Sequence, residues 1–282
     1  MVKNETINRA IDYIFAHIEE KITIEDVAEY CNYSKFHFSR LFKEEMGESL
    51  YSFIKRNRLI RSATKIKLEP GKSITEIGME FGYSSSNYAT AFRELVKESP
   101  VNYRNERKER DGIYVPLFQK GVQKLRTFEE YDAGITIAKL PERRVHYQRF
   151  VGSYEELMLH WKAFVRENQS YVTEDTLWIE RSLSDPEITE KARCICDICM
   201  TVSEDCPLLP VRRLSGGKYA MYHFHAFREQ IYTAYQGLFC VWLPNSPYHC
   251  VSRGKYRDIF DIVRKVEEET GMLTMDICIP IE

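Results

Sequence analysis

The chain has 282 residues, with 44% hydrophobic and 29% charged side chains and a formal net charge of −2. This composition is typical of a globular protein with two domains, and it excludes a disordered chain and a protein that is basic throughout. No apolar run approaches the roughly 18 residues of a membrane helix, so we expect no membrane partner.

The N-terminal segment, MVKNETINRAIDYIFAHIEE, carries acids among its apolar residues and does not predict a signal peptide. We therefore expect a cytoplasmic protein whose eight cysteines are reduced thiols. The sequence contains no glycine-rich phosphate loop or other nucleotide-cofactor motif, so we predict no cofactor.

Residues 23–34, TIEDVAEYCNYS, recur without a gap at residues 73–84 as SITEIGMEFGYS. Ile24 matches Ile74, and Ser34 matches Ser84. Each copy predicts a helix, a tight turn and a second helix. Two such units on one chain can place their second helices in successive turns of a DNA major groove.

The first unit follows an amphipathic helix predicted over residues 4–20. Thr23 and Asp26 predict a capping box at the start of its first helix, and Gly47 predicts the end of its second. On the outer face of the second helix, Arg40 is expected to bond a guanine edge. Lys35 and Lys43 suit phosphates. The same face carries Phe36, for a thymine methyl or for packing, and Ser39.

A long basic helix is predicted from about Leu50 to connect the two units. Residues 34–67 hold nine basic and three acidic side chains, a pattern that suits phosphate contact or a solvated helix face. Ser73 and Glu76 predict a second capping box. The next helix presents a small outer face, which predicts phosphate positioning more than base reading, or a structural helix that touches no DNA. Its candidate DNA-binding residues are Ser85, Ser86, Asn87, Thr90 and Arg93.

Residues 5–110 resemble the DNA-binding region of the AraC family. The resemblance rests on YSKFHFSRLFKEEMGES in the first unit, and on ITEIGMEFGYSSSNYATAF and SPVNYR in the second. It implies an all-α domain over residues 1–110, with about seven helices and two helix-turn-helix units, and double-stranded promoter DNA as its partner. The chain departs from the family at Gly78, where alanine is usual, at Lys97, where a turn glycine is usual, and at Thr90, where a basic side chain is frequent.

Residues 111–130 predict a polar linker with a short strand at 113–115, and residues 131–282 predict a second domain. Within it, residues 135–164 parallel 211–238, and Asp197-Ile198-Cys199 parallels Asp276-Ile277-Cys278. This duplicated β-α-β module predicts an α+β fold with an antiparallel sheet and a ligand cleft between the halves. Aromatic side chains suit an apolar or cationic ligand, or they form the core. The candidates are Tyr147, Trp161, Trp178, Tyr219, His223, Trp242 and Tyr256.

Cys194, Cys196, Cys199 and Cys206 lie within a short stretch that reads as a strand. The first two would share one face and Cys199 the other, which favours packed thiols over zinc or a redox switch. We predict no metal site. No catalytic Ser/His/Asp order or nucleophile elbow is present, so we predict no enzyme.

Residues 131–282 resemble the GyrI-like family of small-molecule-binding domains. The resemblance rests on LPERRVHYQRFVGSYEEL, RCICDICMTV, LSGGKYAMYHFHAF, WLPNSPY and MDICIPIE. The family pattern contributes an acid to the pocket, and Asp258 is its best counterpart by spacing. A rival alignment to Gly254-Lys255-Tyr256 supplies no acid.

Together these features predict a transcription regulator whose C-terminal domain senses a small apolar or cationic effector. RNA polymerase is a further candidate partner. The chain is expected to act as a monomer or weak dimer, because it already carries two DNA-reading units. The alternatives are a ligand-sequestering or partner-docking protein, and a GyrI-like hydrolase.

Overall fold

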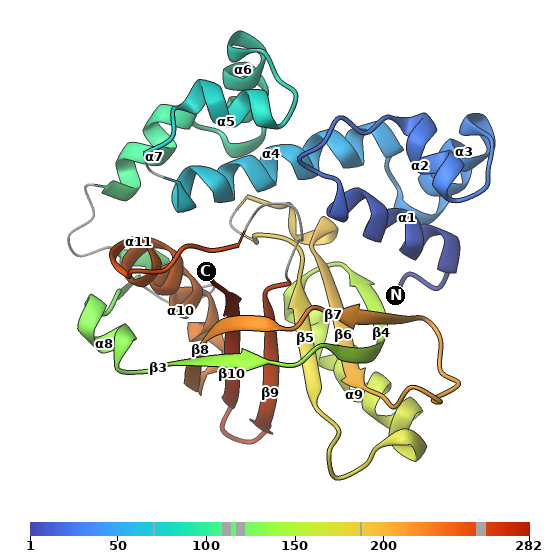
Figure 1. Cartoon of the computed structure of the whole chain (residues 1–282), viewed down its shortest axis with the longest axis vertical. Helices are drawn as coiled ribbons and strands as arrows, with labels where there is room; N and C mark the ends of the chain where they lie inside the picture. Colours follow the sequence, from blue (N-terminus) through green and yellow to red (C-terminus); the bar gives the residue numbers. More distant parts are fainter. Residues whose placement is uncertain (70, 109–113, 117–121, 187, 252–257) are drawn as a thin grey trace. The chain divides into compact units, whose positions relative to one another are not determined.

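A computed structural model gives the fold of residues 1–69, 71–108, 114–116, 122–186, 188–251 and 258–282 (Figure 1). The chain forms two compact units. One holds residues 1–109 and 184–190, and the other holds residues 110–183 and 191–282. Across the described residues, no helix is both long and apolar enough to cross a bilayer.

The first unit is all-α, as predicted. Figure 1 shows a long α4 running between two pairs of short helices, α2 with α3 and α5 with α6. The helices are α1 (Glu5–Ala16), α2 (Ile24–Tyr30), α3 (Lys35–Met46), α4 (Leu50–Leu68), α5 (Ile74–Glu80), α6 (Ser85–Val96) and α7 (Pro100–Lys108).

Capping side chains define the N-termini of α2, α3 and α5 at the residues that the sequence predicts. Thr23 with Asp26 and Ser73 with Glu76 form complete capping boxes at the starts of α2 and α5. The Ser34 hydroxyl accepts a hydrogen bond from the His37 amide at the start of α3. These contacts satisfy amides that the first turn of a helix leaves unpaired.

The two helix pairs differ in how their buried aromatic residue packs. In the first pair Phe38 is buried near Ala28, and in the second Tyr88 and Gly78 occupy the equivalent positions. A β-carbon added to Gly78 would lie 2.8 Å from Cγ of Tyr88. The Tyr88 hydroxyl donates to Ser62 Oγ of α4 at 2.8 Å. Gly78 therefore departs from the family pattern because the tyrosine ring occupies the space of its missing side chain.

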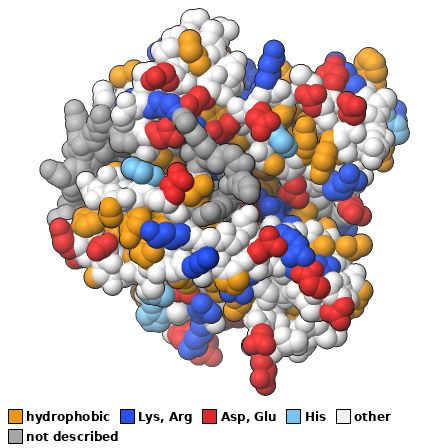
Figure 2. Space-filling view, in the orientation of Figure 1, with side chains coloured by type: hydrophobic (Ala, Val, Ile, Leu, Met, Phe, Trp, Pro, Cys, Tyr) orange, Lys and Arg blue, Asp and Glu red, His pale blue; other side chains and the backbone are white. Residues whose placement is uncertain are grey.

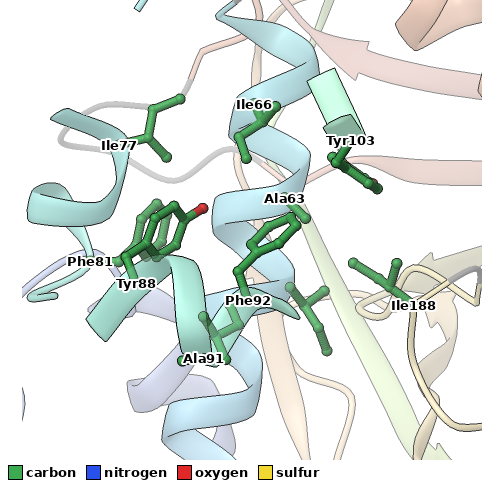
Figure 3. Close-up of a cluster of buried hydrophobic side chains, with 11 residues drawn as sticks. Ala63, Ile66, Ile77, Phe81, Tyr88, Ala91, Phe92, Tyr103 and Ile188 are labelled. Atoms are coloured by element: carbon green, nitrogen blue, oxygen red, sulfur yellow. The ribbon is translucent and has the colours of Figure 1, made fainter. Parts of the chain in front are cut away.

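Figure 3 shows the core around this second helix pair. Ile66, Ile77, Phe92 and Tyr103 pack there, and Ile188 joins them from the segment 184–190. In the same segment, the Asp185 carboxylate lies 3.2 Å from Nζ of Lys67 on α4. The sequence had placed this segment wholly within the second domain.

The second unit contains an eight-stranded antiparallel sheet in its described part, with strand order β3-β8-β10-β9-β5-β6-β4-β7. The strands are β3 (Ile135–Leu140), β4 (Arg143–Val151), β5 (Trp178–Ser182), β6 (Ile195–Thr201), β7 (Val211–Leu214), β8 (Gly217–Phe227), β9 (Phe260–Glu267) and β10 (Met272–Pro280). A separate pair of strands, β1 (Tyr114–Pro116) and β2 (Val122–Lys124), lies in the predicted linker.

Helical segments join and cover these strands. They include α8 (Phe128–Asp132), α9 (Leu157–Asn168), α10 (Ile231–Gly237) and α11 (Leu243–Asn245). Short turns are η1 (Tyr154–Glu156), η2 (Gln169–Tyr171), η3 (Lys191–Arg193), η4 (Arg228–Gln230) and the π-helical η5 (Leu238–Trp242).

The strand order confirms the duplication and extends it. Read from either end, the order is the same when β3 is equated with β7, β4 with β8, β5 with β9, and β6 with β10. The two halves are therefore related by a pseudo-twofold axis between β5 and β9. Each half contains a strand, β5 or β9, that the predicted β-α-β module lacked.

The cysteines pack as predicted from the strand alternation. Cys196 lies in the core beneath α9, and Cys199 lies in the core on the opposite face of the sheet. Burial raises the pKa of both thiols well above the ordinary value, so both are protonated near neutral pH. Among the described residues, no group of three or more metal-ligating side chains is arranged to hold an ion.

The equivalent positions Gly47 and Lys97 both have a left-handed backbone, with φ of 69°. A residue with a β-carbon costs about 1–2 kcal/mol in this conformation. We expect Lys97→Gly to raise the free energy of unfolding by about 1 kcal/mol and Gly47→Ala to lower it by about 1 kcal/mol in urea denaturation.

Gly71→Ala is the matched control. Gly71 lacks a positive φ, and a β-carbon there, as at Gly47, meets nothing within 4 Å. A loss of stability at Gly71 equal to that at Gly47 would show that backbone handedness is not the cause.

Candidate DNA-reading surface and effector site

The outer face of α3 presents the residues that the sequence selected for DNA. Phe36 is 85% exposed, so its ring does not pack within the unit. The Arg40 side chain is 73% exposed, and its Nε lies 3.9 Å from the Glu44 carboxylate one turn later. Lys43 is exposed and Ser39 half-buried. This face combines an extended guanidinium, an ammonium and an open aromatic ring, which suits base edges flanked by phosphates.

Lys35 begins this helix and is held locally. Its Nζ lies 2.5 Å from the Glu25 carboxylate of α2, and both side chains are about half exposed. An exposed pair of this kind contributes little stability, so a phosphate can replace the carboxylate at small cost.

The outer face of α6 is smaller at the equivalent positions. Ser86 stands where α3 has Phe36, and Thr90 stands where it has Arg40. The Thr90 hydroxyl donates to the Ser86 carbonyl at 3.2 Å. Ser85, Ser86, Asn87, Thr90 and Arg93 are all exposed. The outer face of α3 therefore carries longer side chains than that of α6, on which Arg93 is the long basic residue.

Charges on the visible face of the molecule are mixed in sign, and acidic and basic side chains alternate across it (Figure 2). This agrees with the net charge of −2. On this face, any attraction to DNA would come from local basic groups, because a surface of mixed charge creates no broad field.

In the second unit, a buried ion network lies on the sheet face opposite α9. The Arg149 guanidinium donates to both oxygens of Asp197, at 2.7 and 2.8 Å. Arg181 bridges Asp197 at 2.7 Å and Asp258 at 2.5 Å. Arg212 lies 3.6 Å from each of these carboxylates. Both buried carboxylates are thus neutralised by guanidinium groups, as buried charges require.

The other sheet face carries acids with a different environment. Glu180 of β5 and Asp261 of β9 are direct cross-strand partners. Trp161 Nε1 of α9 donates to Glu180 Oε2 at 2.9 Å. The Tyr235 hydroxyl of α10 donates to Asp261, 2.6 and 2.7 Å from its two oxygens. We call Trp161, Trp178, Glu180, Tyr235 and Asp261 the acid–aromatic cluster.

Exposure and pKa values distinguish the two acids of this cluster. Trp161, Trp178, Glu180 and Tyr235 keep partial exposure, whereas Asp261 is fully buried. Burial raises the pKa of the Glu180 carboxyl. Burial and then the neighbouring Glu180 raise the pKa of Asp261 well above its ordinary value. The cluster therefore combines aromatic rings with acids that lack a buried cation among the described residues.

The structure separates the ligand residues selected from the sequence. Trp161 and Trp178 belong to the acid–aromatic cluster and meet edge to face, with ring centroids 6.2 Å apart. Tyr147 and Tyr219 lie in the core on the opposite face. Asp258 belongs to the ion network.

The remaining selected residues lie elsewhere. His223 Nδ1 is 2.6 Å from Asp276 on the face away from the cluster. Trp242 is buried and donates from Nε1 to Asp132 at 2.8 Å. Tyr256 lies outside the described residues.

Sequence reasoning missed Glu180, Tyr235 and Asp261. A usable signal was present, because the duplication makes β5 and β9 equivalent, and each carries an acid beside apolar residues. Trp178-Ile179-Glu180 and Phe260-Asp261-Ile262 are these segments.

A hollow of about 110 Å³ lies between the second half of β8 and the start of α10. Its lining includes Arg126, Tyr131, Tyr222, His223 and Thr233. The Arg126 guanidinium donates to the Tyr222 hydroxyl at 3.0 Å, so this hollow carries a cation and no carboxylate.

Two families of known proteins match the chain. The family described as a helix-turn-helix domain matches residues 27–106. The family described as a GyrI-like small molecule binding domain matches residues 134–282, more than half of the chain.

Known relatives match the first unit. An uncharacterised HTH-type transcriptional regulator of Staphylococcus aureus (strain COL) is 26% identical over 108 residues, 38% of this chain and 14% of the relative. The regulator YbfP of Bacillus subtilis (strain 168) is 30% identical over 105 residues, 37% of this chain and 35% of YbfP. The chain therefore spans well under two thirds of either relative.

The solved EcmrR–DNA complex is 11% identical, covering 88% of this chain and 82% of that chain, with a TM-score of 0.45.

A test of the α3 face compares Arg40→Ala with Lys43→Ala on DNA selected from a random pool by the unmodified protein. We expect Arg40→Ala to weaken the selected site by about 1–3 kcal/mol and to leave scrambled DNA unchanged. Lys43→Ala should weaken both DNAs and reduce the salt dependence by about one ion. Fluorescence anisotropy measures both.

The control is Lys139→Ala, which removes one exposed positive charge from the other unit. An equal loss for Arg40→Ala on selected and scrambled DNA would reduce Arg40 to a phosphate contact.

Proposed function

The chain belongs to the GyrI-like small molecule binding domain family. We propose that it is a helix-turn-helix transcription regulator in which α3 and α6 read promoter DNA and the acid–aromatic cluster binds an effector. The DNA-binding region corresponds to residues 1–110, and the effector domain to residues 131–282.

Support for the DNA surface comes from exposure. The residues on the outer faces of α3 and α6 face solvent, while the opposite faces bury Phe38 and Tyr88. We assign base reading mainly to α3, because the long, exposed side chains of Arg40 and Phe36 can extend to base edges. The small face of α6, with Arg93 at its edge, is assigned mainly to positioning on the phosphates.

The effector is proposed to be an apolar compound with a positive charge. The single observation that carries this proposal is that, within the described part of the chain, the hydrogen-bond donors to Glu180 and Asp261 are Trp161 and Tyr235, both neutral. A buried acid without a cation is costly, and a cationic ligand removes that cost. The rings of Trp161 and Trp178 add apolar and cation–π contact. In this proposal Glu180 and Asp261 take the role that the sequence assigned to Asp258.

The effector is proposed to change promoter occupancy or the recruitment of RNA polymerase. Such a response requires that the ligand bind two states of the protein with different affinity. A protein that only sequesters the ligand would bind it equally well with and without promoter DNA, and a hydrolase would consume it.

The effector site is tested by thermal unfolding with tetraphenylphosphonium, a lipophilic monocation, and with triphenylphosphine oxide, a neutral relative. We expect the cation at about 100 times its dissociation constant to stabilise the protein by about 2.7 kcal/mol. Glu180→Gln should abolish this shift, because it removes the partly exposed acid.

Asp258→Asn is the contrasting variant. It should lower the stability of the free protein, because Arg181 loses a buried partner, yet keep the shift caused by the cation. Loss of the cation response in Asp258→Asn, together with its survival in Glu180→Gln, would move the effector site to the ion network.

A further inference from the structure

Glu180 and Asp261 lie at the centre of the sheet, where the two halves meet. Their strands pair in register, so their β-carbons are about 4.5–5.5 Å apart. Ile198 of β6 is the next residue in this row beyond Glu180, and Ile277 of β10 is the next beyond Asp261. The two carboxyl groups are therefore each other's nearest ionisable neighbours along the row.

The other ionisable groups near the pair are two tyrosines, a thiol, an arginine and a histidine. Burial raises the pKa of Tyr154 on η1, Cys196 on β6 and Tyr235 on α10 well above their ordinary values, so all three are neutral. Arg228 of η4 is permanently charged and exposed. His160 of α9 lies against the Phe150 ring, with centroids 4.4 Å apart, and burial lowers its pKa.

Two close carboxylates in a low-dielectric site cannot both ionise without a cation, and they hold a proton between them instead. The buried ion network shows the alternative within the same sheet. There Asp197 and Asp258 face the guanidinium groups of Arg149, Arg181 and Arg212. Near the acid–aromatic cluster, the described residues supply only the exposed Arg228.

We propose that the empty Glu180–Asp261 pair shares one proton and that a monovalent organic cation binds in exchange for it. The proton passes to solvent as the cation enters. The pair carries one negative charge when it holds the proton. It carries two when it faces the cation, so the net charge of the site is −1 in both states. This inference rests on the effector site proposed above and specifies the charge of its ligand.

Exchange predicts a particular dependence of affinity on pH. When binding releases one proton, the dissociation constant falls up to tenfold for each unit of pH rise. The dependence ends above the pH at which the empty pair has lost its proton. A site with a permanently ionised acid would show a flat profile over the same range.

The experiment is isothermal titration of the whole chain with tetraphenylphosphonium at about pH 7, in phosphate and in Tris. The two buffers differ in ionisation enthalpy, so the difference in observed heat counts the protons released. We expect a release close to one proton and an affinity that rises between about pH 6 and about pH 8.

Asp261→Asn is the diagnostic variant. It nearly preserves the shape of the side chain and its contact with Tyr235, and it leaves Glu180 without a carboxyl neighbour. We expect this variant to bind the cation with almost no proton release and a flat pH profile. A role of Asp261 in packing alone would leave the proton count unchanged.

Binding of the cation to the unmodified chain with equal heats in both buffers would overturn proton exchange and leave the proposed effector site standing. Absence of cation binding at every pH would overturn both proposals. The unmodified chain alone decides between these outcomes, so the test does not depend on whether the variant folds.

Discussion

The antiparallel pairing of β5 with β9 is the constraint on which the second unit depends. Each half of the duplication contributes one of these strands, and their three paired positions join the halves. The two halves also pair at both edges of the sheet, because β3 pairs with β8 of the other half and β7 pairs with β4. The same pairing sets Glu180 opposite Asp261. The pairing of β5 with β9 therefore determines both how the two halves join and where the acid pair lies.

Buried acids on the two faces of this sheet differ in the charge of their hydrogen-bond partners. Asp197 and Asp258 are saturated by guanidinium groups, and removing one partner of such a network is expensive. This makes the network a fixed support for β4, β5 and β6. Among the described residues, Glu180 and Asp261 accept hydrogen bonds from neutral donors, and we propose that their charge responds to a bound ligand. The structural ion network and the proposed effector site therefore lie on opposite faces of one sheet.

The predictable parts of this molecule are those that local sequence specifies. Capping residues such as Thr23 and Ser73 act within one helical turn, and the 50-residue repeat identifies equivalent helices directly. β5 and β9 were not predicted, because Glu180, Arg181 and Asp261 interrupt their apolar pattern. The partners that bury these charges come from distant segments.

The acid of the proposed effector site shows the same limit of sequence-based prediction. Asp258 and Asp261 are separated by three positions, an odd number. Side chains alternate between the faces of a strand, so an odd offset selects the opposite face. Family spacing points to Asp258, whereas the proposal places the acid of the site at Asp261 on the other face. The packing of Ile188 among the helices of the first unit is another contact between distant segments of the chain, and no local sequence pattern predicts it.

α4 joins two helix-turn-helix pairs that are successive copies in the chain rather than partners related by a twofold axis. Its 19 residues span about 28 Å, comparable to one turn of B-DNA at about 34 Å. Arg40 lies in one copy and Thr90 at the equivalent place in the other, so the two ends of the protein are not interchangeable. A symmetric dimer binds a palindrome identically in either direction. This chain has a polarity, so the proposed mode of DNA binding requires a site with a direction.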